Sequence, residues 1–600
     1  MHTRFISLLI IVGFVSFNAP SYAQDVDSTA PKSDFISTKF YHILFDDPLV
    51  NPAPKIVAEA YTVAIPLGAN GKPDVARQKP GSGTSEYEGG RTVVKLLGEQ
   101  TAIEIFDSNG AARVVDLHLT DQPDYVECNR IADDSVVVWI FHRDPTSGSK
   151  SGNPYFAHLF DKSHTDEIRI HMAGGDDYAI VRGNVESSPS IRIIGGEGSD
   201  EMVDSSHIAG KFLFFTKDAK RTYFYGEPSE TNFIYSSSTV LNSEVYSERD
   251  SLRDWGSEFY YGPWLRGSTD QGAFIGARVA FANYDFRDNP FERLISLRAG
   301  FATGPSKYIV DIEQLFPHQL GGQFHFGLRA SSLDVLNFFG YGNTTSVDQN
   351  KYASAGYQLD QQRYELSGEY RNISIEQTSL WGSASLRYST TATDPIKDSS
   401  IIAKRYEYGI GKMTTLRLGI GGSYDSRDDL FAPSKGIFAN FGSYWTPEVI
   451  NNSFAYTKLQ ADIRAYLSVD ILTPITFALR MRADKIFGEH PFFEGCRLGS
   501  VDGLRGYYQD RFAGEESILG SVELRVKLAD FSLLVPQTFG LFLFSDVGRV
   551  HVDNDFSNVW HSSFGGGLSL APVSTTFTVT LTLARSPEST LIYLGSGFAF

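Results

Sequence analysis

The feature that most constrains this chain is a period-two alternation of apolar and polar residues through its second half. From Thr576 to Leu583, apolar residues alternate with threonines, and in Val522–Leu528 every charged residue falls on one face. Successive side chains of a strand point to opposite faces of a sheet, so this pattern predicts strands with one apolar and one polar face. No helical pattern interrupts the series.

The strands predicted from this alternation recur every twenty residues or so. They cover residues 256–265, 270–283, 292–303, 306–315, 321–332, 360–370, 378–390, 410–424, 434–446, 453–468, 473–485, 516–529, 537–549, 561–571, 573–585 and 590–600. An even number of strands is the rule in single-chain bacterial outer-membrane barrels, and closure leaves no unpaired edge in lipid. We predict that residues 255–600 form a sixteen-stranded transmembrane β-barrel whose last strand ends on Phe600.

The first 23 residues favour a membrane barrel over a soluble sheet, because they indicate export. Arg4 precedes an apolar run from Ile6 to Phe17, and Ser21-Tyr22-Ala23 gives small residues at the positions a signal peptidase reads. We predict a cleaved signal peptide over residues 1–23. A membrane anchor is the alternative, but the run is short for a bilayer.

Composition excludes several classes of protein. The net charge is −18, and no basic patch or recognition motif accompanies it, which argues against nucleic acid as a partner. The two cysteines, Cys128 and Cys496, are too few for a disulfide framework or a cysteine metal site. The 55 glycines and the aromatic content of 13% suit strands and tight turns.

A long segment, residues 486–515, interrupts the alternation and carries the motif Leu504-Arg505-Gly506-Tyr507. The next predicted strand contains Gly520 and Glu523, and the one after it contains Phe544-Ser545-Asp546-Val547-Gly548. An arginine in a confined space needs carboxylate partners, and its planar fork suits bidentate pairing. Glycine after the arginine allows a tight turn. An exposed loop arginine is the alternative interpretation.

These three motifs, in this order, resemble the BamA/TamA-type surface-antigen superfamily of outer-membrane assembly and translocation barrels. That family has sixteen strands and a long sixth extracellular loop folded into the lumen, with an aliphatic-Arg-Gly-aromatic tip. The resemblance implies that Arg505 reaches into the barrel and pairs with Asp546, with Glu523 nearby.

Further motifs support the same resemblance. Asp425-Ser426-Arg427-Asp428, with Pro433 and Gly436, is similar to the family's link between strands eight and nine, and residues 338–343 are similar to its Phe-Gly-x-Gly-Asn segment. The final residues Gly595, Phe598 and Phe600 resemble the C-terminal signal by which assembly machinery recognises barrel clients.

The first half, residues 24–250, does not resemble the POTRA domains that usually precede such barrels. It contains short β-rich pieces and polar linkers but no convincing amphipathic helix. Two units repeat a short strand followed by a Gly-Gly-acidic turn, at residues 166–177 and 191–200. This imperfect repeat predicts stacked β-rungs, that is, a soluble β-solenoid-like domain.

The second of these turns raises the question of calcium. Gly195 to Val203 fits the calcium-binding nonapeptide of β-roll proteins, in which Gly195, Gly196 and Asp200 with loop carbonyls would hold the ion. Plain turns are the alternative.

The first half also resembles the connector of proteins that join a metallophosphoesterase to a surface-antigen barrel. The phosphoesterase motifs Gly-Asn-His-Glu/Asp and Gly-His-x-His are missing, and Asp116-Leu117-His118 stands alone. No Gly-x-Ser-x-Gly nucleophile motif occurs either. We therefore predict no enzyme activity and no catalytic, cofactor or metal residues.

The resemblance implies a barrel in the outer membrane of a Gram-negative bacterium that inserts or translocates other proteins. Its partners would be outer-membrane lipid, the machinery that assembles the barrel itself, and protein clients. The missing POTRA domains favour a second hypothesis, in which the barrel is an anchor or self-transport pore for residues 24–250. The sequence leaves open on which side of the membrane those residues lie.

Overall fold

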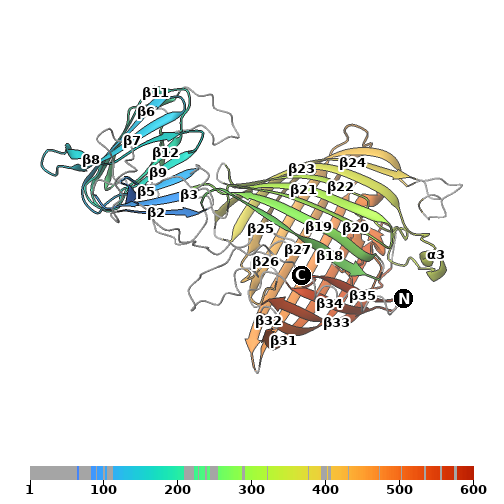
Figure 1. Cartoon of the computed structure of the whole chain (residues 1–600). Coiled ribbons are helices and arrows are strands. Elements are labelled where there is room, and N and C mark those ends of the chain that lie inside the picture. The colour runs from blue at the N-terminus through green and yellow to red at the C-terminus, as the bar shows by residue number, and fades with distance from the viewer. Residues whose placement is uncertain are drawn as a thin grey trace.

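The computed structural model is almost entirely β-structure and contains a closed barrel and an N-terminal unit of stacked strands beside one end of it (Figure 1). It describes residues 64–65, 83–88, 91–98, 102–103, 113–208, 222–226, 229–236, 239–242, 254–269, 271–286, 291–319, 322–375, 377–392, 402, 407–429, 432–471, 473–501, 503–532, 536–553, 557–572 and 578–600. The predicted signal peptide, residues 1–23, lies outside the described residues.

The barrel confirms the predicted fold class. Sixteen antiparallel strands close on themselves, in chain order. They are β18 (Ser257–Ser268), β19 (Gly272–Asn283), β20 (Arg293–Ala302), β21 (Lys307–Gln319), β22 (Gly322–Ser331), β23 (Asp360–Ile375), β24 (Thr378–Ala392), β25 (Gly411–Asp425), β26 (Gly436–Thr446), β27 (Tyr456–Asp470), β28 (Pro474–Phe487), β31 (Glu516–Ser532), β32 (Pro536–His551), β33 (His561–Pro572), β34 (Val579–Arg585) and β35 (Thr590–Ser596).

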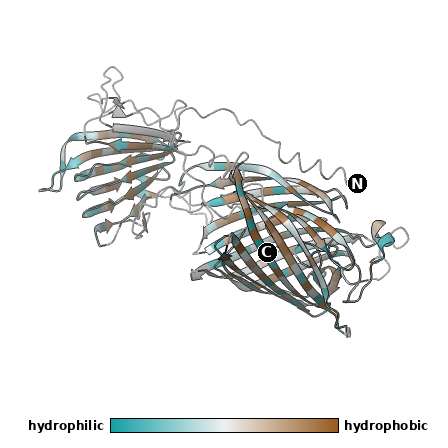
Figure 2. Cartoon of the chain, turned by 90° about the horizontal axis from the view of Figure 1, so that it is seen from below, coloured by the Kyte–Doolittle hydropathy of each residue, from teal (hydrophilic) through white to brown (hydrophobic). Residues whose placement is uncertain are grey.

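The alternation in the sequence becomes an outer and an inner face of this wall. In β31, Val522 is 49% exposed, whereas Glu523 and Arg525 beside it are buried. In β34, Leu583 is exposed and Thr582 is buried. Apolar residues therefore face outward and polar residues line the lumen, which Figure 2 shows as alternating brown and teal along the strands.

The end of the chain corrects one prediction. The last strand, β35, ends at Ser596 and not at Phe600. Residues 597–600 leave the wall, although Phe598 and Phe600 continue the alternation of the strand. The period-two pattern therefore extends beyond the sheet here.

The two ends of the barrel differ in their connections. At the end where β18 begins, each connection between barrel strands has ten residues or fewer. The shortest are tight: β21 ends at Gln319 and β22 begins at Gly322, and β27 ends at Asp470 before β28 begins at Pro474. At the other end, the connections 332–359, 393–410 and 488–515 are long. The first contains α3 (Gln349–Ala353), and the third contains η2 (Phe492–Glu494), β29 (Cys496–Leu498) and β30 (Phe512–Gly514).

The N-terminal unit consists of two sheets packed face to face. A seven-stranded sheet has the order β17-β15-β12-β9-β5-β3-β2, and a six-stranded sheet has the order β16-β13-β10-β6-β7-β8. The strands are β2 (Gly83–Glu88), β3 (Arg91–Leu96), β5 (Val114–His118), β6 (Asp124–Ala132), β7 (Ser135–Arg143), β8 (Lys150–Asp161), β9 (Glu167–His171), β10 (Tyr178–Arg182), β12 (Ser190–Ile194), β13 (Asp200–Asp204), β15 (Thr222–Tyr225), β16 (Thr231–Ile234) and β17 (Thr239–Asn242). Two short pairs, β1 (Ala64–Ile65) with β4 (Ala102–Ile103) and β11 (Asn184–Val185) with β14 (His207–Ile208), lie outside these sheets.

From β9 to β17, successive strands of the two sheets alternate between them, so each pair forms one rung. Earlier in the unit, β2 and β3 are antiparallel neighbours in one sheet, and β6, β7 and β8 are antiparallel neighbours in the other. β9 is followed by β10, and β12 by β13, and each strand pairs in parallel with its counterpart in the next rung. A core of Val115, Leu117, Ile170, Val126 and Val181, among others, fills the space between the sheets. This is a β-solenoid arrangement, and it contains no helix within the described part of residues 64–242.

The glycines of the repeated turns allow the rungs to stack. A Cβ on Gly196 would lie 1.9 Å from the carbonyl oxygens of Met172 and Ala173, and one on Gly198 would lie 2.2 Å from that of Gly175. Only glycine fits such an approach of two backbones. No helix among the described residues is long and apolar enough to cross a membrane.

Candidate functional site

The loop of residues 488–515, which we call the lumenal loop, carries the predicted motif into the barrel. Arg505 is 1% exposed and contacts Glu523 and Asp546, which are both 0% exposed and occupy inward positions of β31 and β32. The neighbouring outward residues of these strands, Val522 and Val547, are exposed. The structure therefore brings the three sequence-predicted residues together inside the lumen.

Arg505 forms a bidentate pair with Asp546. Its Nε donates to Oδ2 at 2.7 Å and its Nη2 donates to Oδ1 at 2.6 Å, while its backbone N–H donates to the same carboxylate at 3.2 Å. Its Nη1 donates to Glu523, and the guanidinium lies 3.5 Å from the ring centroid of Phe544. Burial alone would lower the pKa of Arg505, but Asp546 and Glu523 outweigh it and raise that pKa. The arginine is thus held as a cation among matched partners.

The other residues of the motif fix the tip of the loop to the last two strands. Gly506 has φ +83°, and a Cβ there would lie 3.1 Å from the backbone of Arg585. Its N–H donates to the hydroxyl oxygen of Tyr593 at 3.1 Å, and its carbonyl accepts bonds from the hydroxyls of Ser586 and Ser589 at 2.7 Å. The tip of the lumenal loop is therefore bonded to β35 and the turn before it.

The aliphatic and aromatic residues of the motif are packed rather than exposed. Leu504 is fully buried with Phe512 and Leu519. Tyr507 is 1% exposed, its ring lies 5.4 Å from that of Phe512, and its hydroxyl donates to the carbonyl of Ser562. The tetrapeptide is thus one embedded unit, with the arginine on its polar side.

Sequence reasoning missed a second buried arginine in the same loop, Arg511. It is 0% exposed and pairs with Glu588, in the turn between β34 and β35, at 2.7 Å through two nitrogens. It also donates to Thr345 in the connection after β22. Arg511 was visible in the sequence, but Glu588 occupies a short turn with no periodic signal, so nothing indicated their pairing.

A third charged anchor holds the start of the lumenal loop to the opposite part of the wall. Glu494, which is 6% exposed, pairs with Arg417 and with Arg387, the latter at 3.3 Å, and its carbonyl accepts from Lys458 at 3.0 Å. Burial alone would raise the pKa of Glu494, but Arg417 and Arg387 hold it well below its usual range. Three separate ionic contacts therefore secure this loop.

The seam where the barrel closes is its weakest junction. Between β18 and β35, both described along their length, only Gly267 with Leu594 and Ser268 with Tyr593 are in register. Thr269 adds two bonds to Ile592, at 3.2 and 3.3 Å. All of these contacts lie at the long-loop end. The rest of β18, residues 257–266, pairs with β19 but not with β35.

The predicted C-terminal signal residues lie in two places. Gly595 is part of β35, where a Cβ would meet no atom within 4 Å. Phe598 and Phe600 lie inside the barrel, and Phe600 is 6% exposed. They contact Arg525 of β31, a residue that sequence reasoning placed only on the inward face.

A separate ionic cluster joins the N-terminal unit to the barrel. Arg169 of β9 is 1% exposed and pairs with Glu167 at 2.5 Å and with Asp254, just before β18, at 3.1 Å. Arg192 of β12 pairs with Glu167 at 2.8 Å and with Asp285, just after β19, at 3.1 Å. We call this the junction cluster. It lies on the outer face of the seven-stranded sheet.

Aromatic rings complete the junction cluster. Phe286 lies 4.7 Å from Arg169 and 5.1 Å from Arg192, and Trp255 lies 4.2 Å from Arg91. Both rings are at least nine-tenths buried. The N-terminal unit is therefore held to the short-connection end of the barrel by charged and aromatic contacts.

The isolated Asp-x-His tripeptide belongs to the edge of this cluster. Asp116 pairs with Arg91 at 2.5 Å and with His171 at 2.9 Å, and His118 stacks on His171 with centroids 4.2 Å apart. Burial alone would raise the pKa of Asp116, but Arg169, His171 and Arg91 hold it well below its usual range. These side chains neutralise one another within the described fold.

The turn predicted as a calcium site is occupied by its own hydrogen bonds. The carboxylate of Asp200 accepts from the backbone N–H of Gly196 at 3.1 Å and of Asp177 at 3.2 Å. Gly195 and Gly196 provide the close approach between rungs. Among the described residues, no group of three or more His, Cys, Asp or Glu side chains is arranged to hold a metal ion. Calcium binding stays a prediction.

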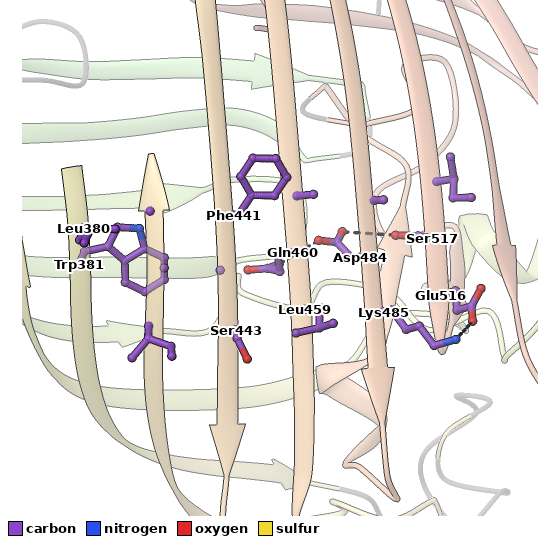
Figure 3. Close-up of a pocket in the computed structure, with 17 residues that line it drawn as sticks. Leu380, Trp381, Phe441, Ser443, Leu459, Gln460, Asp484, Lys485, Glu516 and Ser517 are labelled. Atoms are coloured by element: carbon purple, nitrogen blue, oxygen red, sulfur yellow. Dashed lines mark hydrogen bonds and ion pairs between the residues drawn. The ribbon is translucent and has the colours of Figure 1, made fainter. Parts of the chain in front are cut away.

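The outer wall carries a shallow apolar hollow across β24–β28 and β31 (Figure 3). Large outward residues, Leu380, Ile420 and Phe441, surround smaller ones such as Ala461. The Lys485–Glu516 ion pair lies at its edge, as the dashed line in Figure 3 shows. Buried residues of the same strands, Trp381, Asp484 and Ser517, also contribute to its lining.

Comparison with known proteins agrees with the geometry of the barrel. Residues 297–600 match the model of the Omp85 superfamily domain. No curated protein sequence matches the chain.

Several solved structures are similar in fold. BamA from Haemophilus ducreyi lacking POTRA domains 1–3 matches with 14% identity and a TM-score of 0.42, over 57% of this chain and 70% of that one. CdiB from Acinetobacter baumannii matches with 12% identity and a TM-score of 0.35, over 57% of this chain and 59% of that one. CdiB from Escherichia coli matches with 13% identity and a TM-score of 0.38, over 58% and 66%. The chain thus spans less than two thirds of both CdiB chains.

Proposed function

This chain belongs to the Omp85 superfamily, and its barrel is an outer-membrane insertion or translocation barrel; from that premise we propose that it passes segments of client proteins sideways into the membrane through the seam between β18 and β35. The observation that carries the proposal is the pairing of this seam. Only two residue pairs join the strands, and both lie at the long-loop end.

An incompletely paired strand edge offers backbone N–H and C=O groups to another extended segment. Residues 257–266 of β18 present such an edge, because β35 does not pair with them. Pro263 lies within this stretch and has no backbone N–H to donate to a ladder. A client strand could therefore add to β18 without first breaking an existing strand pair there.

We also propose that the N-terminal unit lies in the periplasm of a Gram-negative bacterium. In outer-membrane barrels the short turns face the periplasm and the longer loops face outward. The junction cluster holds the N-terminal unit at the end with the short connections, beside Asp254 and Asp285. Clients arriving from the periplasm would meet this unit before they reach the seam.

A disulfide across the seam tests the proposal. In a background in which Cys128 and Cys496 are replaced by serine, Gly267→Cys with Leu594→Cys would link registered partners of β18 and β35. In proteoliposomes, we expect oxidation to stop the insertion of a client barrel, measured as protease-protected product, and reduction to restore it.

The matched control places the same disulfide in a complete part of the wall. Leu524 of β31 and Leu543 of β32 are registered partners, so Leu524→Cys with Leu543→Cys should leave insertion unchanged on oxidation. Equal insertion by the oxidised and reduced seam variant would rule out lateral passage between β18 and β35.

The second candidate function is an anchor for the N-terminal unit, favoured by the buried contacts of the junction cluster. Deleting the coding region for residues 24–250, or the whole gene, separates the two. Loss of other outer-membrane proteins after whole-gene deletion supports client insertion. An unchanged profile of outer-membrane proteins supports the anchor. Neither proposed function gives the chain a catalytic role.

A further inference from the structure

A patch of five residues lies on the outer surface of β32, β33 and β34, at the long-loop end of the barrel. These three strands are neighbours in the wall, and β34 adjoins β35 of the seam (Figure 1). The residues are Arg549 near the end of β32, Trp560, Ser562 and Phe564 at or just before the start of β33, and Arg585 at the end of β34. Trp560 is 50% exposed and Phe564 is 64% exposed. We call this set the rim patch.

Strand register and a ring contact join these residues into one surface. Arg585 lies directly opposite Phe564 in the ladder of β33 and β34. The guanidinium of Arg549 lies 5.6 Å from the ring centroid of Trp560, and its Nη2 donates to the carbonyl of Ser557 at 2.8 Å. Arg549 is therefore held at one end of the patch, and Arg585 stands at the other end.

The wall does not neutralise these two arginines. Within the described part of the chain, neither guanidinium forms an ion pair. Glu588, which follows Arg585 in the next turn, pairs with Arg511 of the lumenal loop. The outward positions of β32 to β35 hold no Asp or Glu. By contrast Lys485, an outward cation of β28 at the same end of the barrel, pairs with Glu516. The rim patch thus presents two uncompensated positive charges.

The position of the patch determines which part of the membrane it meets. The longer loops of outer-membrane barrels face outward, and aromatic residues gather at the two interfaces of the membrane. An outward arginine is costly at the bilayer midplane and much less so near an interface. Leu568 and Leu583, which are 43% and 53% exposed, continue the same faces of β33 and β34 toward the middle of the wall. The arginines therefore lie at the level of the outer-leaflet headgroups, and the leucines lie beside the acyl chains.

The spacing of the two arginines fits a headgroup that carries two phosphates. Arg585 and Ser545 both lie opposite Phe564, on either side of β33. Arg549 lies further along the same face of β32 than Ser545. At about 3.4 Å per residue and about 4.8 Å per strand, the Cα atoms of the two arginines are about 17 Å apart. Because Trp560 holds Arg549 at its own end, each guanidinium meets a separate phosphate through its planar fork.

We propose that the rim patch binds one lipid of the outer leaflet whose headgroup carries two phosphates, with Arg549 and Arg585 each holding one phosphate. Phe564 and the exposed leucines contact the acyl chains, which a free phosphate ion lacks. The site goes beyond the function proposed above and does not depend on lateral passage, because none of the residue pairs that join β18 to β35 takes part in it.

Native mass spectrometry of the full-length protein in detergent tests the site directly. Delipidated protein is titrated with diphosphoryl lipid A, monophosphoryl lipid A or phosphatidylcholine, and the lipid-bound fraction gives the affinity for each. We expect the diphosphoryl form to bind about tenfold more tightly than the monophosphoryl form, because it adds a charge-assisted contact, and phosphatidylcholine to bind least. Equal binding of the mono- and diphosphoryl forms would overturn the proposal, and this comparison needs no variant.

Variants assign the phosphates to the two arginines. Arg549→Gln and Arg585→Gln should each weaken the binding of diphosphoryl lipid A about tenfold. Arg585→Lys should restore part of the affinity, because lysine keeps the charge but lacks the planar fork. Since Gly506 contacts only backbone atoms of Arg585, these changes leave the tip of the lumenal loop in place. Unchanged affinity in both glutamine variants would sink the idea.

Two controls separate this site from a general effect of charge. Lys412→Gln removes an exposed cation at the start of β25, at the same end of the barrel but on another part of the wall, and should leave the affinity unchanged. A loss equal to that of Arg585→Gln would contradict a specific site. An excess of inorganic phosphate should not displace the lipid, and displacement would show a site for a free anion instead. The heat-dependent gel mobility of a folded barrel checks each variant.

Discussion

In the barrel, buried carboxylates pair with arginines. In the turns of the N-terminal unit, the buried carboxylates of successive rungs stack on one another. Asp546 accepts two bonds from the guanidinium of Arg505 inside the lumen. In the stacked turns, Asp177 accepts from the backbone N–H of Asp124, and Asp200 accepts from that of Asp177. The first arrangement pairs a carboxylate with a guanidinium, and the second places acids close together with backbone N–H groups as their donors.

The difference follows from the two kinds of sheet. In the barrel, strands far apart in sequence face one lumen, so a loop can bring a cation to acids on β31 and β32. In the N-terminal unit, each rung repeats the position of the last, so the same residue type recurs one rung above. The repeat gives backbone amides as partners, and burial raises the pKa of Asp177 to about 8 and that of Asp200 to about 6.

The largest effect is expected from breaking the ion pair in the barrel. Asp546→Ala leaves Arg505 buried with only Glu523 as a charged partner, and removing one member of a buried pair costs about 3–5 kcal/mol. Urea unfolding in detergent, followed by the gel mobility of the folded barrel, would measure the loss. Asp553→Ala, at an exposed acid after β32, is the control.

A double replacement sharpens the same point. Arg505→Met with Asp546→Leu removes both charges, and Glu523 keeps Arg525 as a partner. Replacing a buried pair by apolar residues is often neutral, so most of the lost stability should return. A double variant as unstable as Asp546→Ala would show that packing, and not the unpaired charge, dominates.

A smaller effect is expected at the junction cluster. Arg169→Met removes contacts to Asp254 and Glu167, but Glu167 keeps Arg192, and bonds to charged groups contribute about 1.5–3 kcal/mol. Hydrogen exchange should rise at β9 and around Trp255 and stay unchanged in the barrel. The exposed Arg182 provides the control through Arg182→Met. Exchange that rises equally in both variants would exclude a specific role for Arg169.

The smallest effect is a pH dependence confined to the N-terminal unit. The folded-state pKa of Asp177, raised to about 8, lies above its unfolded value of about 3.9, so its contribution is lost as pH rises through 8. Burial lowers the pKa values of His118 and His158 to about 4, so these residues change the stability of the unit with pH only below pH ~6.5. The urea midpoint of this unit should therefore fall between pH 6.5 and 8.

Asp177→Asn isolates that dependence. The amide oxygen can still accept the N–H of Asp124, but the side chain no longer ionises. The midpoint should then stay level across this pH range, whereas Asp134→Asn, at an exposed acid, should keep the parent's slope. A parent without any slope would contradict the raised pKa of Asp177.

The strands of the barrel could be predicted from sequence because period two is a property of each strand by itself. In β31, the alternation of Val522 and Glu523 assigns each side chain to a face of the strand without any information about neighbouring strands. The same property explains the one error at the end of the chain. Phe598 and Phe600 keep the alternation, and nothing in it indicates that their apolar partners are Phe542 and Tyr466 across the lumen instead of lipid.

The contacts of the candidate site could be predicted only for residues that belong to a short sequence motif. Arg505 and Asp546 stand in short motifs, so their meeting could be inferred from resemblance. The partners of Arg511 and Arg169 could not, because Glu588 and Asp254 lie in connections whose positions depend on how whole elements pack. Alternation gives the face of a residue, and only the three-dimensional fold gives its partner.

The one-ended seam has a mechanical consequence. When two strands are pulled apart sideways from one end, their hydrogen bonds break one after another, as in peeling. In shear, by contrast, the bonds would share the load. Because Gly267 and Ser268 are paired and the rest of β18 is not paired with β35, separation begins with most of the seam already parted. Under the proposed lateral passage, the work of opening is set by the few bonds beside the tip of the lumenal loop.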